Sequence, residues 1–162
     1  DSKLEGESTS VDISGLIGQY AHGNEPSHHI AHLYNYVGQP WRTQEIVDEV
    51  LHTLYFNNPD GLSGNEDCGQ MSAWYILNAM GFYQVCPGKP VYSIGRPLFN
   101  EATVHLKDGK SFKVIAHNNS RDNKYVRSIV LNGNKLETPF FTHQDIVDGG
   151  TLELTMSEQP VC

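Results

Sequence analysis

The first half of the chain carries apolar residues at the three- and four-residue steps that are typical of amphipathic helices. Glycine and proline residues divide this region into three predicted helices. The helices are expected to run from after Pro26-Ser27 to Gly38, from about Pro40 to Tyr55, and from about Gly69 to Met80. Their shared faces are Ile30, Leu33, Tyr34 and Val37 in the first, Ile46, Val47, Val50, Leu51 and Leu54 in the second, and Met71, Trp74, Tyr75 and Asn78 in the third.

A different pattern begins after Cys86-Pro87-Gly88, where short strand-like runs replace the helical stripes. Asp108-Gly109 stands between two such runs and predicts a tight hairpin, because this pair supports the positive φ that the turn requires. Asn132-Gly133 after the run 125–131 repeats the signal. Residues 151–156 alternate as a final strand with one buried face.

These patterns predict an α+β chain with a flexible tail over residues 1–10, a helical part over 11–86 and an antiparallel β subdomain over 87–162. The β part is expected to form a small antiparallel sandwich. Three helices are too few to close an all-helical domain, and apolar residues such as Trp41 and Trp74 would then lack cover. We therefore expect the chain to be a carboxy-terminal piece of a larger protein.

Charge and cysteine content narrow the classes of function. The 162 residues include 11 Lys and Arg against 19 Asp and Glu, which gives a net charge of −8 with the histidines neutral. This charge would repel phosphate backbones and anionic lipids, so neither nucleic acid nor a membrane is an expected partner. Three cysteines allow at most one disulfide, and their redox state stays open. Residues 1–10 lack the basic start and apolar stretch of a signal peptide, so the compartment also stays open.

The segment 64–70, Gly-Asn-Glu-Asp-Cys-Gly-Gln, places two carboxylates in a glycine-bounded loop before a predicted helix. An Asp at a helix N-terminus is kept ionised by backbone N–H groups, which is the state that a general base needs. An alternative is structural, because Asp67 as N-cap with Gln70 three residues later would form a capping box. Both interpretations are open at this point.

The segment 22–29, His-Gly-Asn-Glu-Pro-Ser-His-His, gathers oxygen and imidazole groups in a second loop before a helix. Asn and Glu oxygens suit a hard cation such as calcium. His28 and His32 stand four residues apart, which is compatible with zinc, but His29 occupies the position where the zincin motif needs Glu. Alternatively, Ser27 or Asn24 caps the helix while a histidine fills a polar position in the core.

The sequence resembles glycoside hydrolase family 92, the calcium-dependent exo-acting α-mannosidases. Three motifs carry the resemblance, and they occur in the family's order and spacing. They are GQYAHGNEPSHH over residues 18–29, YNYVGQPW over 34–41 and PDGLSGNEDCGQMSAWY over 59–75. Weaker similarity continues, so that the resemblance covers roughly residues 11 to 156.

The resemblance implies a fold in which the last helices of an (α/α)6 barrel precede carboxy-terminal β structure. It implies an inverting hydrolysis, in which one carboxylate activates water and a protonated one assists departure of the leaving group. The substrate class would be mannose-containing glycans, and the implied location is secreted or periplasmic. The implied residues are Asp67 as base with Glu66 beside it, Asn65 and His22 toward substrate, and Glu25 with Asn24 toward Ca²⁺.

The family's general acid is a glutamate in an upstream segment that this sequence does not match. The remainder of a parent polypeptide would therefore have to supply it, and these residues alone are expected to be inactive or nearly so. Three alternatives remain: another (α/α)-barrel glycosidase, a non-catalytic carbohydrate-binding module built on the β part, and a structural accessory domain.

Overall fold

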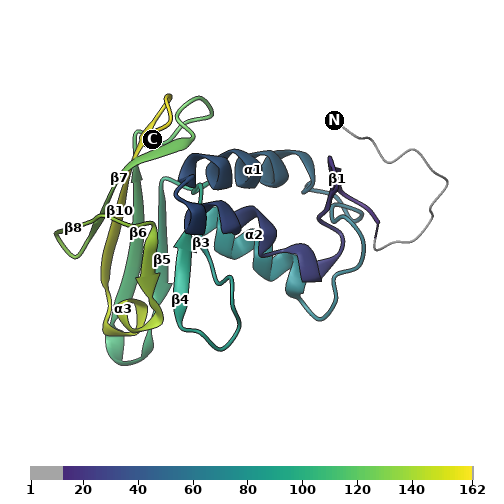
Figure 1. Cartoon of the computed structure of the whole chain (residues 1–162). Helices are drawn as coiled ribbons and strands as arrows, with labels where there is room; N and C mark the ends of the chain where they lie inside the picture. Colours follow the sequence, from purple (N-terminus) through teal and green to yellow (C-terminus); the bar gives the residue numbers. More distant parts are fainter. Residues whose placement is uncertain (1–12, 162) are drawn as a thin grey trace.

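The computed structural model describes residues 13–161, and the predicted tail over residues 1–10 lies outside them. Helices and strands occupy two parts of the molecule that pack side by side (Figure 1). The first part contains β1 (Leu16–Ile17), β2 (Tyr20–Ala21), the 3₁₀ helices η1 (Glu25–Ser27) and η2 (Ile30–Val37), α1 (Pro40–Thr53) and α2 (Gln70–Met80). The second contains β3 (Phe82–Tyr83), β4 (Val91–Ile94), β5 (Glu101–His105), η3 (Lys107–Gly109), β6 (Ser111–His117), β7 (Tyr125–Leu131), β8 (Asn134–Leu136), β9 (Phe140–Thr142), α3 (His143–Asp148) and β10 (Gly150–Ser157).

The second and third predicted helices are confirmed as α1 and α2. Trp74 lies at the centre of their shared core and is fully buried with Val47 and Val50. The expectation that Trp74 lacks cover is therefore wrong, because α1 and the 22–32 region enclose it. Gly81 ends α2 with a φ of 106°, the left-handed conformation that glycine adopts at least cost.

The first predicted helix forms, but as the 3₁₀ helix η2, and its apolar stripe faces outward. Ile30, Leu33 and Val37 are 41%, 42% and 67% exposed, whereas His32 and Asn35 on the other side are buried. His32 and Asn35 are buried because both ring nitrogens of His32 and the amide nitrogen of Asn35 find hydrogen-bond partners there, as described below. Ile30, Leu33, Tyr36 and Val37 thus form an exposed face of η2, on which Tyr36 packs against Phe140 with ring centroids 4.7 Å apart.

The strands form a two-stranded pair β1-β2, a five-stranded sheet in the order β5-β6-β10-β7-β8 and a three-stranded sheet in the order β3-β4-β9. Both predicted hairpins are confirmed, with positive φ at Asp108 and Gly109 and at Asn132 and Gly133. The expectation of purely antiparallel pairing is wrong for one pair, since β10 runs parallel to β6. Helix α3 directly precedes β10, and β10 lies in the middle of the sheet between β6 and β7.

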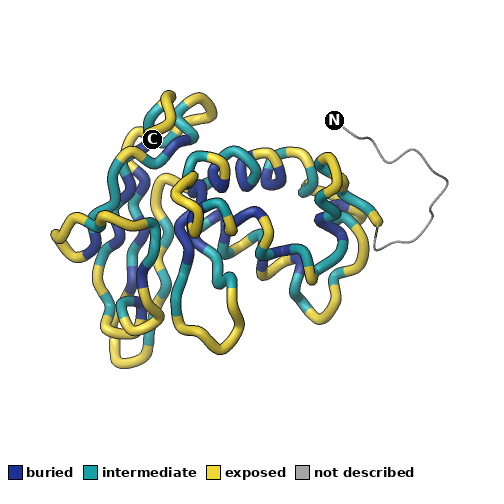
Figure 2. The backbone as a smooth tube through the Cα atoms, viewed as in Figure 1, coloured by how far each residue is buried: buried dark blue, intermediate teal, exposed yellow. Residues whose placement is uncertain are grey.

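The predicted alternation of the last strand is confirmed. Leu152, Leu154 and Met156 of β10 are at most 3% exposed and pack with Phe112 of β6. Buried segments accordingly line the inner side of the five-stranded sheet, where the three-stranded sheet and the helices cover it (Figure 2). The other face carries polar residues such as His117 and Glu153, which form a pair at 2.8 Å.

A chain of polar groups joins η2 to α2 and to β4. The His32 Nε2–H group donates to Asn78 Oδ1 at 2.8 Å, and the Ser93 hydroxyl donates to His32 Nδ1 at 3.1 Å. Asn35 Nδ2 lies 2.6 Å from Ser93 Oγ and 2.8 Å from the Ile94 carbonyl oxygen. All of these side chains are buried, so the contact between the helical and strand parts depends on specific hydrogen bonds as well as on apolar packing.

A buried ion pair fixes α1 against the strand part. Arg96 is 2% exposed, and its Nε atom lies 2.9 Å from Asp48 Oδ1 of α1. The Arg96 guanidinium also donates to the carbonyl oxygens of Pro97 and Ser120. Arg121 approaches the same carboxylate at 3.1 Å from outside. One aspartate thus balances a fully buried cation and a second, half-exposed one.

We expect Asp48→Asn to lower the free energy of unfolding by about 3–5 kcal/mol, because the substitution leaves the Arg96 cation buried without its counter-charge. Glu137→Gln is the matched control, since the pair of Glu137 with Lys135 is exposed at both ends and is worth at most about 1 kcal/mol. Urea unfolding followed by circular dichroism measures both. Equal losses in the two variants would contradict the role given to Asp48.

The fold should also lose stability as the pH falls from neutral. Burial lowers the pKa of His32 from 6.5 to about 4, so the unfolded chain binds a proton that the folded chain excludes. Between pH 7.5 and pH 5 this difference costs about 2 kcal/mol, and the loss begins near the unfolded pKa. His32→Gln removes the titrating group, so its urea midpoint should depend less on pH than that of the unsubstituted protein. Parallel pH curves for the two proteins would refute this assignment.

Candidate active site

The loop before α2 holds its predicted acidic residues in an unusual backbone conformation. Asp67, Cys68 and Gly69 have φ values of 47°, 57° and 89°, so three consecutive residues are left-handed. Residues with a Cβ atom rarely adopt this backbone conformation, and each such residue costs on the order of 1 kcal/mol or more of stability. The backbone closes on itself at both ends, with Gln70 N donating to Asp67 O and Met71 N donating to Glu66 O.

This turn presents Asp67 to solvent. Asn65 and Asp67 are exposed, and among residues 13–161 no hydrogen bond or ion pair engages the Asp67 carboxylate. The capping-box interpretation of Asp67 is wrong, because the N-cap of α2 is Gly69, which has no side chain to accept a capping hydrogen bond. The lone pairs of Asp67 are therefore available to a water molecule, as a general base requires.

Glu66 has a different environment. Its Oε1 accepts from Ser72 N at 3.0 Å and its Oε2 accepts from the Ser72 hydroxyl at 2.6 Å. These hydrogen bonds lower the pKa of Glu66, so the carboxylate stays ionised at the first turn of α2. The two neighbouring carboxylates thus differ, one being bound to the helix and the other free.

The second loop is folded by contacts of its own backbone. Gly23 N donates to Ser14 O at 3.0 Å, and a Cβ at Gly23 would collide with the Ser14 side chain, so only glycine fits there. The Ser27 hydroxyl lies 2.6 Å from the carbonyl oxygens of both Ala21 and Asn24. Neither Ser27 nor Asn24 caps a helix through an accepting side chain, so that interpretation is wrong.

The expectation that a histidine fills a polar core position is confirmed for His22, His28 and His32. His22 Nδ1 lies 2.8 Å from the Tyr20 hydroxyl and Nε2 lies 2.6 Å from the Tyr55 hydroxyl, which itself donates to Met71 O. Burial and the neighbouring His28 lower the pKa of His22 to about 3. His22 is thus neutral and fully enclosed, and this placement does not favour the direct substrate contact that the resemblance implies.

His28 and Gln70 join the two loops. His28 Nε2–H donates to His22 O at 2.9 Å, and Gln70 Nε2 donates to His28 Nδ1 at 3.0 Å and to the Tyr83 hydroxyl at 3.1 Å. Trp74 Nε1 donates to His28 O at 3.0 Å. The first residue of α2 is in this way tied to the segment that carries Glu25.

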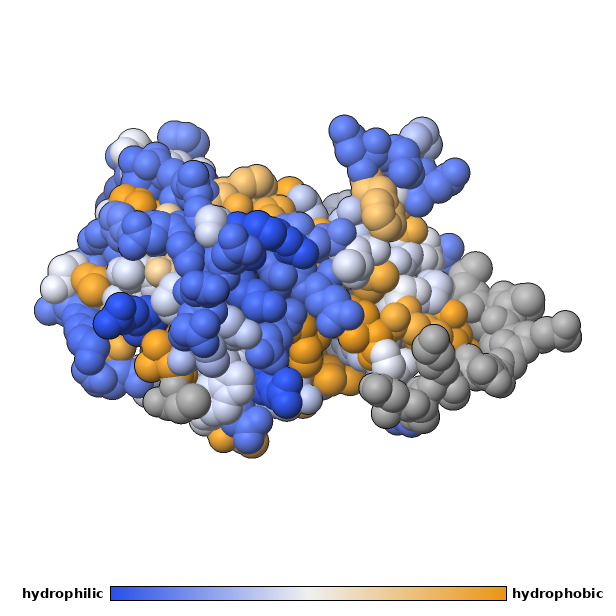
Figure 3. All heavy atoms as spheres, turned by 90° about the horizontal axis from the view of Figure 1, so that it is seen from above, coloured by the Kyte–Doolittle hydropathy of each residue, from blue (hydrophilic) through white to orange (hydrophobic). Residues whose placement is uncertain are grey.

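An open hollow of about 400 Å³ lies where the two loops meet. Its lining residues are Glu25, Pro26, His28, His29, Gln70, Tyr83, Gln84, Val85 and Pro87. Of the predicted site residues, Glu25 lines this hollow, whereas Asn24, Asn65, Glu66 and Asp67 do not. Figure 3 shows that the surface over the helical part mixes apolar and weakly polar side chains, while the strand part is largely hydrophilic.

The side chains present form no complete metal site. No group of three His, Cys, Asp or Glu residues within 13–161 converges on one point. Both ring nitrogens of His28 and of His32 are hydrogen-bonded, so the zinc interpretation fails. Calcium takes six to eight oxygen ligands, of which Glu25 and Asn24 provide at most a few. Their oxygen chemistry fits part of a calcium shell.

Several supporting residues were missed by sequence reasoning. Tyr55 and Ser72 lie in predicted helices and showed no signal that distinguishes them from ordinary helix positions. The spacing of Gln70 after Asp67 indicates only a capping role, whereas in the structure Gln70 joins the two loops. Cys68 and Cys86 are free thiols and exposed.

Comparisons with known proteins show which family the chain resembles in sequence and structure. Residues 2–158 match the catalytic domain of glycosyl hydrolase family 92. A GH92 α-mannosidase from Bacteroides thetaiotaomicron, solved in complex with mannoimidazole, is 47% identical with a TM-score of 0.88 over 93% of this chain and 20% of its own. A GH92 inverting mannosidase from the same organism is 49% identical with a TM-score of 0.82 over 88% of this chain and 19% of its own.

An uncharacterized secreted glycosidase from Arthroderma benhamiae is 30% identical over 140 residues, which are 85% of this chain and 18% of that protein. The chain thus spans about a fifth of the length of these relatives. No helix in the described part of the chain is long and apolar enough to cross a membrane. The family match extends over nearly the whole sequence, and the chain belongs to glycosyl hydrolase family 92.

Proposed function

We propose that this chain is the carboxy-terminal part of the catalytic region of an inverting, calcium-dependent exo-α-mannosidase that hydrolyses α-mannosides of glycans. The observation that carries the proposal is the Asp67 carboxylate, which is exposed and unengaged on a turn held at both ends. In an inverting hydrolysis the base takes a proton from a water molecule that attacks the anomeric carbon. Asp67 can accept that proton without breaking any contact of its own.

The rest of the barrel would complete this site. The relatives are about five times as long as the chain, so most of their residues have no counterpart here. The exposed apolar face of η2, formed by Ile30, Leu33, Tyr36 and Val37, supports packing against further helices of an (α/α)6 barrel. The general acid is then a residue outside this chain, and the 162 residues alone have little or no activity.

The hollow beside the loops is the place where a calcium ion and the sugar would meet. Calcium would polarise sugar hydroxyls and help to distort the ring toward its transition state. Glu25, which lines the hollow, would supply a carboxylate oxygen to that shell. Asn24 precedes it in the same loop and would supply an amide oxygen from beside the hollow. His22 would support the loops from the interior through its hydrogen bonds with the Tyr20 and Tyr55 hydroxyls. Asn65 would contact the substrate from its exposed position near Asp67.

Asp67→Asn in the full-length protein should lower kcat by about 10²–10⁴ for an α-linked mannobioside, because the amide cannot accept the proton from water. Proton NMR of the first product follows both the rate and the anomer. An inverting reaction releases β-mannose first.

Release of α-mannose first would exclude inversion, and full activity of Asp67→Asn would exclude this residue as base. Hydrolysis of other sugars with equal efficiency would favour a barrel glycosidase of different specificity. A carbohydrate-binding module would instead keep its sugar affinity after residues 1 to 86 are deleted.

Glu25→Gln should raise the calcium concentration required for half-maximal activity by about tenfold or more, because a neutral amide replaces a charged oxygen ligand. Titration of the chelator-treated full-length protein with CaCl₂ measures this shift. Glu49→Gln on the exposed face of α1 is the charge-matched control and should leave the titration unchanged. Activity that persists in excess chelator would contradict the calcium requirement.

A further inference from the structure

Glu66 closes a short ring with the first turn of α2. Its two carboxylate oxygens reach Ser72 N at 3.0 Å and the Ser72 hydroxyl at 2.6 Å, and its carbonyl oxygen accepts from Met71 N at 3.2 Å. The backbone and the side chain of Glu66 therefore accept hydrogen bonds from two consecutive helix residues, Met71 and Ser72. The residues between, Asp67 to Gln70, must fit inside this ring.

The ring explains the left-handed turn. An isolated chain avoids positive φ at non-glycine residues, and such a conformation persists only where the surroundings over-determine it. Asp67 and Cys68 both have positive φ, and the contacts of Glu66 with Ser72 and Met71 fix the two ends of the segment that contains them. If these contacts open, Asp67 can return to ordinary backbone angles and its carboxylate moves.

We propose that Glu66 is a positioning residue, whose side chain holds the turn that aims Asp67, and that Glu66 takes no part in the proton transfers of the reaction. This inference rests on the proposed function of Asp67. A catalytic carboxylate needs an oxygen directed at water or at the leaving group. Both oxygens of Glu66 are instead directed at the N-terminus of α2, where backbone N–H groups favour a negative charge.

A positioning role and a catalytic role for Glu66 predict different effects when an amide replaces its carboxylate. Glu66→Gln keeps one oxygen that accepts from Ser72, so a positioning residue should tolerate it, with kcat within about fivefold of the unsubstituted protein. Glu66→Ala removes both contacts and should lower kcat by about 10², with KM nearly unchanged, because a misplaced base costs rate and not substrate affinity. Ser72→Ala keeps the backbone N–H group and should lie between them.

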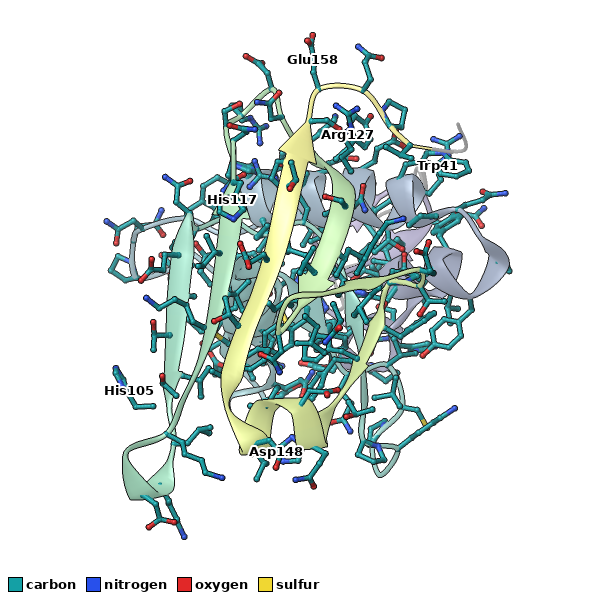
Figure 4. The ribbon with its side chains drawn as sticks, turned by 90° about the vertical axis from the view of Figure 1, so that its left-hand side faces the viewer. Trp41, His105, His117, Arg127, Asp148 and Glu158 are labelled. Atoms are coloured by element: carbon teal, nitrogen blue, oxygen red, sulfur yellow. The ribbon has the colours of Figure 1, made fainter. Side chains whose placement is uncertain are left out.

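The experiment measures kcat, KM and the pH profile of the full-length protein on an α-linked mannobioside. The variants are Glu66→Gln, Glu66→Ala, Ser72→Ala, the double variant Glu66→Ala with Ser72→Ala, and Asp67→Asn. Glu158→Gln is the charge control, since Glu158 lies beyond the end of β10 and points away from the molecule (Figure 4). Because Ser72 acts only through Glu66, the double variant should be no slower than Glu66→Ala alone.

The pH profile of Glu66→Gln should keep its acidic limb, since Asp67 is still present. A Glu66→Gln variant as slow as Asp67→Asn would show that the charge of Glu66 takes part in the chemistry, and the inference would fall. Full activity of Glu66→Ala, with or without a lower melting temperature, would also overturn it. Full activity of Asp67→Asn is a separate outcome, which removes the proposed function itself and the positioning role with it.

Discussion

The arrangement of the molecule depends on one buried charge, the guanidinium of Arg96. A cation that is 2% exposed is tolerated only when a counter-ion lies beside it. Asp48 supplies the counter-ion from α1, and the carbonyl oxygens of Pro97 and Ser120 take two of the N–H groups from the strand part. The pair therefore ties α1 to the strand part at a defined point. Apolar packing alone would permit sliding, because it is not directional.

Hydrogen bonds of neutral histidines connect α1 and its core to the candidate site. Trp74 packs against α1, and its indole N–H group donates to His28 O. His28 donates to His22 O and accepts from Gln70, and these bonds join the loop of Glu25 to the first turn of α2. The imidazoles can serve in this way only while uncharged, since each presents one donor and one acceptor nitrogen. Burial lowers the pKa values of His22, His28 and His32 and keeps them in that form.

Much of the fold followed from the sequence, and the exceptions share a physical cause. Periodicity located α1 and α2, and Asp-Gly and Asn-Gly located the hairpins, because these signals are local. The inward face of η2 was not predictable, since His32 and Asn35 are buried by partners 46 to 61 residues away in sequence. The parallel position of β10 beside β6 is likewise set by tertiary packing. The motifs identified both loops of the site, but only the structure distinguished the bound carboxylate of Glu66 from the free one of Asp67.

That difference between adjacent carboxylates has a simple origin in the direction of the chain. Glu66 precedes the left-handed turn, and its side chain reaches across the turn to Ser72 N of α2, whereas Asp67 lies within the turn and is exposed. A single acidic residue could not do both, because the lone pairs that hold the helix end are no longer available to water. Two neighbouring carboxylates separate the tasks, since the ionised and hydrogen-bonded one maintains the conformation in which the other stays solvated. Fixed backbone geometry is what allows an exposed side chain to meet a reacting atom with the accuracy that catalysis requires.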